Sequence, residues 1–208
     1  MANTQEIMSK AVAAADKFRT FDQKQTDQIV RAVYLAALDH RVSLAKLAHE
    51  ETGMGVWQHK VIKNVIATQL VYEDISHQKT VGVIYENPRK GLIEVAQPLG
   101  PILGFIPVTN PTSTTIFKAL ICLKSRNPLI ISPHQAAKAC TCTAAEICYQ
   151  AALKAGAPSD CIQCLDRPSS TTLDELMTHP RLGLIIATGT EAIVRKASLS
   201  GKPAIGVG

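Results

Sequence analysis

The sequence of 208 residues lacks the features that mark membrane, secreted and nucleic-acid-binding proteins. No apolar run approaches the roughly 18–20 residues that a membrane-spanning helix needs, and the opening segment, MANTQEIMSK, has no signal-peptide core. Aromatic residues make up only 4% of the chain, and the Lys and Arg residues behind its formal charge of +5 are scattered. We therefore expect a cytoplasmic protein that binds neither membrane nor nucleic acid, although its charge suits a phosphate-bearing ligand.

The cysteines show no strong metal or disulfide pattern. Cys161 and Cys164 form a CxxC, but no second pair lies at zinc-ribbon spacing and no His follows at zinc-finger spacing. We favour small buried thiols in a reducing compartment over a ligand role, and expect no metal site. The expected thiols are Cys122, Cys140, Cys142, Cys148, Cys161 and Cys164.

Residues 1–78 are predicted to form a helical segment that packs on the rest of the chain. Apolar residues recur at helical spacing over 4–18, 28–39 and 56–74. A further helix is expected between Ser43, a candidate N-cap, and Gly53, a candidate C-terminal stop.

Residues 79–98 are predicted to form a β-hairpin. Apolar residues alternate on both sides of the turn segment ENPRKG. Because an isolated two-stranded hairpin is only marginally stable in water, we expect it to pair with another element, such as a second subunit of a homo-oligomer.

From Leu99 onward, strands and helices alternate. Strands are predicted at 102–106, 129–132, 161–165 and 182–187, and helices at 112–124, 136–154, 173–177 and 191–199. Thr172 and Glu175 have the spacing of a capping box for the third of these helices. This order predicts an α/β fold with a doubly wound parallel sheet over residues 99–208. Ligands of such sheets bind beyond the carboxyl ends of the strands, which directs attention to the loops 107–110 and 132–134.

Seven stretches distributed along the whole chain carry a family resemblance. They are ETGMG, KVIKN, PVTNPTSTTIFKAL, KSRNPLIISPH, KAGAPSDCI, HPRLGLIIATG and SGKPAIGVG. Together they resemble the aldehyde dehydrogenase superfamily, within it the CoA-acylating branch, and most closely the acetaldehyde dehydrogenase half of bifunctional aldehyde-alcohol dehydrogenases. The resemblance implies a nicotinamide-binding sheet, a dimer formed through the hairpin, NAD as cofactor, CoA as co-substrate and a small aldehyde or acyl-CoA as substrate.

The resemblance also implies roles for individual residues. Asn110 would donate its side-chain amide to the oxygen of the thiohemiacetal that forms when a cysteine attacks the aldehyde. The residues themselves leave another interpretation open, since Asn110 followed by Pro111 is also a good helix N-cap and first-turn pair. The remaining residues assigned to cofactor binding are Ile106, Pro107, Val108, Thr109, Ser132, Pro133, His134, Thr188, Gly189, Thr190, Val194, Gly206, Val207 and Gly208.

Two features of the sequence qualify the cofactor-binding assignments, one at His134 and one directly after Thr190. A lone His is usually structural, so His134 keeps a structural interpretation beside the cofactor-binding one. Glu191 and Ala192 stand where the acylating relatives would carry a small Gly-Pro step, which departs from their pyrophosphate-binding pattern. No G-x-G-x-x-G is present, but the family binds its cofactor without that motif.

The last residues bear on the reaction. Gly206-Val207-Gly208 resembles the place where hydrolytic members carry Glu-Leu-Gly, so their general base is absent and a thiol such as CoA would take the acyl group instead. In the family the nucleophilic cysteine lies in a further domain, and no cysteine here matches its motif. We therefore expect an enzyme fragment that is inactive alone. The alternatives are a non-catalytic assembly module that uses the hairpin, and a hydrolytic NAD(P)-dependent relative.

Overall fold

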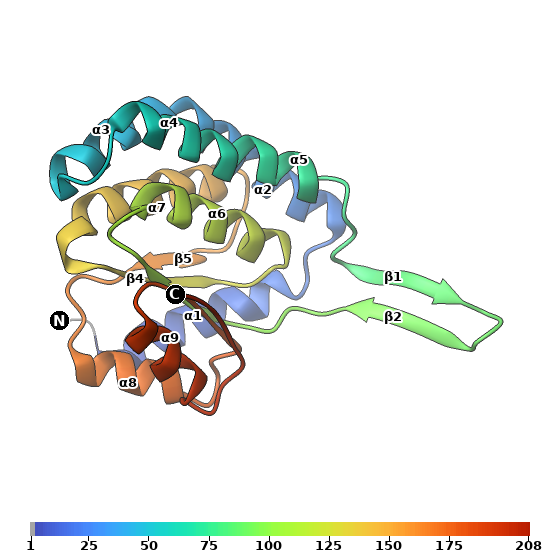
Figure 1. The fold of residues 1–208 in the computed structure, drawn as a ribbon. Coiled ribbons are helices and arrows are strands. Elements are labelled where there is room, and N and C mark those ends of the chain that lie inside the picture. Colours follow the sequence, from blue (N-terminus) through green and yellow to red (C-terminus); the bar gives the residue numbers. More distant parts are fainter. Residues whose placement is uncertain (1–2) are drawn as a thin grey trace.

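A five-stranded parallel sheet with helices on both faces forms the body of the molecule, and a separate two-stranded hairpin projects from it (Figure 1). The computed structural model describes residues 3–208. In spatial order the strands are β5 (Ile162–Cys164), β4 (Leu129–Pro133), β3 (Ile102–Ile106), β6 (Leu184–Thr188) and β7 (Ala204–Val207). The chain adds strands first to one side of β3 and then to the other, so the predicted doubly wound α/β fold is confirmed.

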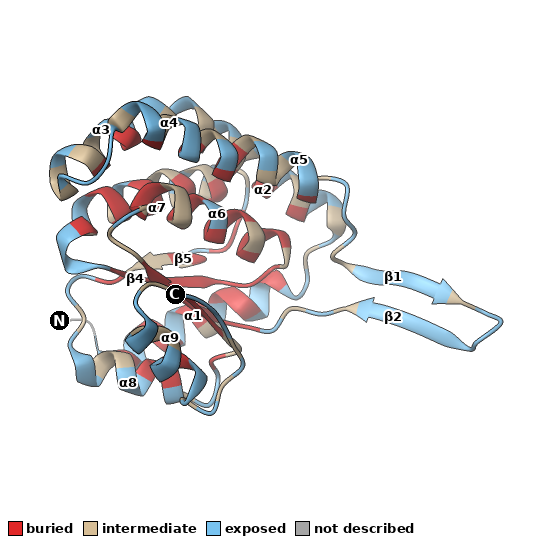
Figure 2. Ribbon diagram, viewed as in Figure 1, coloured by how far each residue is buried: buried red, intermediate tan, exposed pale blue. Residues whose placement is uncertain are grey.

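Two apolar layers sandwich the sheet, because successive strand residues point to opposite faces. Ile102 and Ile106 of β3 join the core cluster on one face, whereas Leu103 and Phe105 join the cluster on the other. The first face is covered by α2 (Gln23–Asp39), α6 (Pro111–Lys124) and α7 (Lys138–Lys154), and the second by α1 (Thr4–Phe18), α8 (Ser170–Thr178) and α9 (Glu191–Ser198). Figure 2 shows the buried residues concentrated on the sheet and on the inner sides of these helices.

The remaining helices form an outer layer over α6 and α7. They are α3 (Arg41–Thr52), α4 (Trp57–Val65), the π-helical turn η1 (Ile66–Leu70) and α5 (Val71–Ile75). The last three make one continuous helical stretch, as predicted for 56–74, but the π-helical turn was not expected. The helices predicted before the hairpin are therefore present, with α1 on one face of the sheet and α2 on the other.

The predicted start of α2 was wrong. The side chain of Asp22 accepts a hydrogen bond from the Gln25 backbone N–H at 2.7 Å, and Oε1 of Gln25 accepts one from the Asp22 N–H at 3.0 Å. This reciprocal capping box lies inside the polar segment FDQKQTD, so the helix begins at Gln23 rather than near residue 28.

Two predicted caps were also wrong. Ser43 lies within α3, which starts after His40 without a side-chain cap. At α8 the cap is Ser169, whose Oγ accepts a hydrogen bond from the Thr172 N–H at 3.0 Å. Glu175 instead accepts a hydrogen bond from the Thr4 hydroxyl of α1. At α3 the expectation failed because the helix begins without a side-chain cap. At α8 it failed because Ser169, three positions before Thr172, can also cap a helix and does so.

The predicted hairpin is confirmed. Strands β1 (Gly82–Asn87) and β2 (Leu92–Ala96) pair antiparallel, with a bulge between Val83 and Tyr85. The Arg126 guanidinium donates to the backbone carbonyls of Thr80 and Ala96, each at 3.3 Å, and so ties both ends of the hairpin to the body. Its large apolar side chains are exposed, namely Val83, Ile84, Tyr85, Leu92, Ile93 and Val95.

Cysteine chemistry differs from the prediction at two positions. Cys142 of α7 and Cys164 of β5 form a disulfide, although they are separated by 22 positions. The other four, Cys122, Cys140, Cys148 and Cys161, are buried free thiols as expected, and burial raises the pKa of each to about 12. Sequence spacing could not reveal the pair, because only the packing of α7 beside β5 brings the two sulfurs together.

Two further properties apply to residues 3–208. No helix in this range is long and apolar enough to cross a membrane. No cluster of three or more His, Cys, Asp or Glu side chains in the same range has the arrangement to hold a metal ion.

Candidate functional site

Three loops meet at the carboxyl edge of the sheet. Strands β4, β3 and β6 are parallel neighbours, so the segments that follow Ile106, Ile131 and Ala187 leave the sheet on the same side. They enclose a cavity of about 360 Å³, which we call the strand-end cleft. It is lined by Phe105, Ile106, Pro107, Ser132, Pro133, His134, Gln135, Leu173, Thr188, Gly189, Thr190 and Ile193. The structure thus brings together eight of the residues singled out from the sequence.

The β4 end of the cleft presents the imidazole ring of His134. Ser132 and Pro133 are buried, whereas His134 is exposed. Nδ1 of His134 accepts a hydrogen bond from the Ala136 backbone N–H at 3.2 Å and so caps a short 3-10 turn. A neutral imidazole in this arrangement carries its proton on Nε2, which leaves that nitrogen as a donor beside the cleft. The structural and the ligand-binding interpretations of His134 are therefore compatible.

The β6 end of the cleft has space for a ligand to approach the backbone. Thr190 is the N-cap residue of α9 and its side chain makes no capping hydrogen bond. A Cβ atom on Gly189 would lie 2.9 Å from Cγ2 of Ile193, so a side chain here would fill the space between strand and helix. The Ile193 N–H donates to the Thr190 carbonyl at 3.0 Å, and no side chain caps the helix start. A helix start of this kind next to a glycine suits a phosphate group. The β6 end of the cleft therefore has room for a phosphate-bearing group, with the acidic Glu191 in the first turn of α9.

A second cavity, of about 480 Å³, adjoins the cleft, and we call it the Asn110 hollow. It is lined by Lys63, Ile66, Ala67, Val71, Asn110, Ser113, Thr114, Phe117, Thr188 and Val207. Thr188 borders both cavities, so one elongated ligand could reach from the cleft into the hollow. No cysteine lines either of them.

The side chain of Asn110 is not used as a helix cap. Asn110 occupies the N-cap position of α6, but its side chain makes no capping hydrogen bond. Its Oδ1 accepts a hydrogen bond from Lys63 Nζ at 2.6 Å, and its Nδ2 donates to the Thr109 hydroxyl at 3.3 Å. Asn110 and Pro111 therefore occupy the N-cap and first-turn positions as that interpretation predicts, but the Asn110 side chain does not cap the helix, and its amide stays available at the wall of the hollow.

Helix α4 holds the loop that carries Asn110. Lys60 is buried and donates to the Thr109 carbonyl at 3.0 Å, and Oδ1 of Asn64 accepts a hydrogen bond from the Thr112 hydroxyl at 2.9 Å. Burial, and then the neighbouring Lys63, lower the pKa of Lys60. The segment KVIKN was expected to carry part of the family resemblance, with no role for these residues. Their i, i+3, i+4 spacing places them on one helix face and was the available signal.

A buried lysine supports the strand ends from beneath. Nζ of Lys118 donates to the backbone carbonyls of Phe105 and Ile186, the latter at 2.8 Å, and the side chain is fully buried. Burial lowers the pKa of Lys118 to about 7. A Cβ atom on Gly104 would lie 3.3 Å from Cδ of Lys118, so the glycine leaves room for the lysine stem. Sequence reasoning missed Lys118 because it lies within an otherwise apolar helix.

Several residues singled out from the sequence lie outside both cavities. Val108 packs against a small cluster around Ala48, and Val194 packs beneath Gly206. Thr109, Gly206 and Gly208 are exposed and line neither cavity. In place of Val194 the preceding residue, Ile193, faces the strand-end cleft. Helical periodicity alone could not distinguish these neighbours, because both are half-buried.

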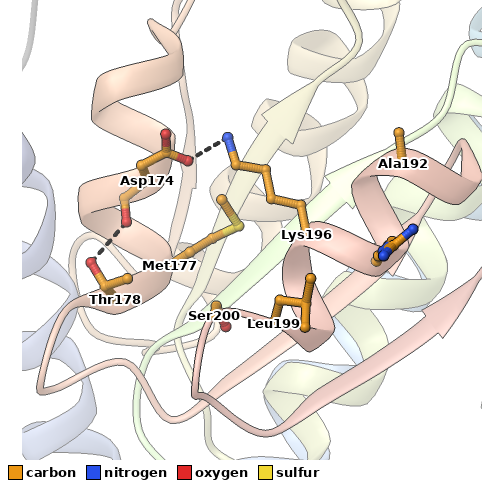
Figure 3. Close-up of a pocket in the computed structure, with 8 residues that line it drawn as sticks. Asp174, Met177, Thr178, Ala192, Lys196, Leu199 and Ser200 are labelled. Atoms are coloured by element: carbon orange, nitrogen blue, oxygen red, sulfur yellow. Dashed lines mark hydrogen bonds and ion pairs between the residues drawn. The ribbon is translucent and has the colours of Figure 1, made fainter.

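A third cavity, of about 490 Å³, lies between α8 and α9 and contains none of the residues predicted for the site. Figure 3 shows Asp174 of α8 paired with Lys196 of α9, with Met177 and Leu199 beside them. The ion pair connects two helices that also contribute Leu173 and Ile193 to the strand-end cleft. The pair therefore bears on the spacing of the helices at that cleft.

Comparison with known proteins gives concordant matches. Residues 1–202 match the family described as the aldehyde dehydrogenase family. The chain is 48% identical to the bifunctional aldehyde-alcohol dehydrogenase AdhE of Escherichia coli (strain K12) over all 208 residues, which cover 23% of that protein. The crystal structure of an acetylating aldehyde dehydrogenase from Geobacillus thermoglucosidasius superposes with a TM-score of 0.96 at 43% identity, over 99% of this chain and 45% of that one.

A third similar protein was solved with a ligand. The propionaldehyde dehydrogenase of Rhodopseudomonas palustris, with bound CoA and an acylated cysteine, superposes with a TM-score of 0.85 at 27% identity. The match covers all of this chain and 47% of that one. The chain thus spans less than half the length of each of these three relatives.

Proposed function

Because the chain belongs to the aldehyde dehydrogenase family, we propose that it provides the dinucleotide site and the oxyanion-stabilising amide of a CoA-acylating aldehyde dehydrogenase. The reaction is aldehyde + NAD⁺ + CoA ⇌ acyl-CoA + NADH + H⁺, with acetaldehyde and acetyl-CoA as the proposed pair. The observation that carries the proposal is the convergence of three strand-end loops on one cleft that adjoins Asn110.

The strand-end cleft binds the dinucleotide, and the Asn110 hollow binds the aldehyde. Residues of the strand-end cleft hold the dinucleotide, with the α9 start and Gly189 next to its phosphates and His134 next to its polar groups. When bound, the nicotinamide accepts the hydride. The amide of Asn110 donates to the substrate oxygen, where negative charge develops in the transition state. Phe117 and Ile66 give the hollow the apolar wall that a short alkyl group requires.

Position 206 favours CoA over water as acyl acceptor. Hydrolysis needs a base that deprotonates water, and glycine supplies none. A Cβ atom on Gly206 would lie 2.3 Å from Cγ1 of Val194, so this backbone leaves no room for a glutamate without rearrangement. These points argue against the hydrolytic alternative.

The nucleophilic thiol of the proposed reaction comes from residues outside this chain. Cys122, Cys140, Cys148 and Cys161 are buried with pKa values raised to about 12, and Cys142 and Cys164 are joined in a disulfide. None of the six lines the strand-end cleft or the Asn110 hollow. On this proposal, the 208 residues alone bind the dinucleotide but do not oxidise aldehyde.

The hairpin is the proposed site of self-association. The exposed apolar side chains of the hairpin form the surface through which copies of the protein associate, because such a ribbon gains stability by burying them. We place the protein in the cytoplasm, where NAD and CoA are available.

Calorimetric titration of the 208-residue chain with NAD⁺ tests the dinucleotide site. We expect binding that weakens about tenfold in I193A, since Ile193 lines the strand-end cleft. The matched control is L199A, which removes an apolar side chain at the C-cap of the same helix, outside the cleft, and leaves affinity unchanged. Absence of NAD⁺ binding by the folded chain would favour the assembly-module alternative.

Turnover by the full-length gene product tests the reaction. NADH formation from acetaldehyde should require CoA and yield acetyl-CoA. NADH formation with release of free acetate in the absence of CoA would replace the acylating reaction by the hydrolytic one.

A further inference from the structure

We infer that Lys63 is a positioning residue that fixes and polarises the amide of Asn110, a role that rests on the proposed function. Lys63 lies on α4, and its Nζ is 2.6 Å from Oδ1 of Asn110 at the wall of the Asn110 hollow. The proposed function itself assigns no role to Lys63.

The identity of the two groups determines which way the amide points. An ammonium group only donates hydrogen bonds, and of the two polar atoms of the Asn110 amide, Oδ1 and Nδ2, only Oδ1 accepts one. The flipped amide would place N–H groups against the ammonium at 2.6 Å, with two donors facing each other. Lys63 therefore directs Nδ2 away from itself, where one N–H donates to the Thr109 hydroxyl at 3.3 Å and the second can serve a ligand oxygen.

The charge of Lys63 also strengthens that second donor. A cation bonded to the carbonyl oxygen of an amide draws electron density from its nitrogen, and hydrogen bonds in such a chain reinforce one another. An oxyanion that forms beside Nδ2 is thus stabilised more than it would be by an amide in water.

The rest of the face of α4 holds the two partners in register. Lys60 donates to the Thr109 carbonyl at 3.0 Å, and Asn64 accepts from the Thr112 hydroxyl at 2.9 Å. The π-helical turn η1 follows directly and contributes Ile66 and Ala67 to the same hollow. The exposed Lys63–Asn110 pair therefore lies between two further contacts that join α4 to the same loop.

The experiment compares single and double variants of the full-length gene product, measured by NADH formation from aldehyde and CoA. N110A should lower kcat by about 100-fold or more, as for other oxyanion donors. K63M should lower kcat by about 10-fold to 100-fold and leave KM for NAD⁺ unchanged, because Lys63 does not line the strand-end cleft. K63R keeps a donor-only cation and should recover most of kcat.

The double variant separates positioning from a mere structural role. If Lys63 acts through Asn110, K63M should cost less than about twofold when added to N110A. The matched control is K10M, since Lys10 is an exposed helical lysine with its Nζ 2.7 Å from Oε1 of Glu6, away from the hollow. The K10M variant should keep the wild-type kcat. Thermal melting should show that each variant is folded. A crystal structure of K63M should show the Asn110 amide reoriented.

Two outcomes would overturn the inference while the proposed function stands. One is a folded K63M with the wild-type kcat, and the other is a double variant in which the two losses multiply. A wild-type product that forms no NADH with aldehyde and CoA would overturn the proposed function, and this inference with it.

Discussion

Val194 of α9 packs directly beneath Gly206 of β7. A Cβ atom on Gly206 would lie 2.3 Å from Cγ1 of Val194, closer than non-bonded carbon atoms approach. Gly206 pairs with Ala187 in the register of β6 and β7. A side chain at position 206 would therefore require Val194 or β7 to shift.

The first prediction concerns this contact. G206A should lower the free energy of unfolding by about 1–3 kcal/mol, the usual cost of overpacking. V194A removes the clashing methyl groups, so V194A/G206A should be more stable than the sum of the single effects predicts. Urea denaturation of each variant measures these values. G208A is the control, because its added Cβ would meet Cγ2 of Val194 at 3.6 Å, an ordinary contact. Strict additivity in the double variant would contradict the packing described.

The second prediction concerns Lys118, whose pKa is lowered by burial from 10.5 to about 7. Below pH 7 this amine is charged in both the folded and the unfolded chain, so its full burial cost applies. Between pH 7 and 10.5 the unfolded chain binds more protons, so stability rises with pH. Relative to K118M, the free energy of unfolding of the wild-type chain should therefore increase by about 2 kcal/mol from pH 6 to 8.5.

Urea denaturation of both proteins across this pH range provides the measurement. Taking the difference between them removes the contribution of the buried thiols, which are common to both. A wild-type minus K118M difference that stays flat from pH 6 to 8.5 would mean that Lys118 stays charged in the folded protein.

The third prediction concerns the disulfide between Cys142 and Cys164. The bond closes a loop with a sequence separation of 22, and the chain-entropy relation assigns such a loop about 3 kcal/mol of stability. Reduction should lower the free energy of unfolding by this order, measured by urea denaturation with and without reductant. C142S/C164S should be insensitive to reductant, and C122S, which removes a thiol that is already free, should respond as the wild-type chain does.

Periodicity and turn chemistry were enough to predict the layers of this fold. The helix predicted over 112–124 is α6, and its face formed by Ile116, Ala119, Leu120 and Leu123 is buried. Buried strands such as 102–106 have an unbroken apolar character that amphipathic helices do not share. The errors lie at helix starts, where Asp22 and Ser169 show that several nearby polar residues compete for one cap.

The candidate site was predictable only in part. Parallel strands must end at one edge, so the meeting of the loops after Ile106, Ile131 and Ala187 follows from topology alone. The contacts of Lys60, Lys63 and Asn64 with the Asn110 loop connect segments almost 50 positions apart, and no local pattern encodes such a distance. Which of Ile193 and Val194 faces the strand-end cleft likewise depends on how β7 packs on α9, because Val194 contacts Gly206 of β7 and Ile193 lines the cleft.

The final prediction concerns association through the hairpin. Ile93 and Val95 of β2 have 57% and 51% of their surface exposed, and successive strand residues point to opposite faces, so the two share one face of the ribbon while Glu94 lies on the other. If that apolar face is buried between copies of the protein, I93K/V95K places two cations in the contact. Light scattering of the full-length gene product should then show a shift toward the monomer.

The control for this prediction is E94K, which changes the net charge by the same +2 units on the opposite face, since one Glu becomes Lys. E94K should keep the oligomeric state of the wild-type protein if the face with Ile93 and Val95 forms the contact. Equal dissociation in both variants would point to a general charge effect, and no dissociation in either would move the interface away from the hairpin. Because the apolar side chains of β1 are exposed as well, V83K should reproduce the shift if both strands of the ribbon take part in the contact.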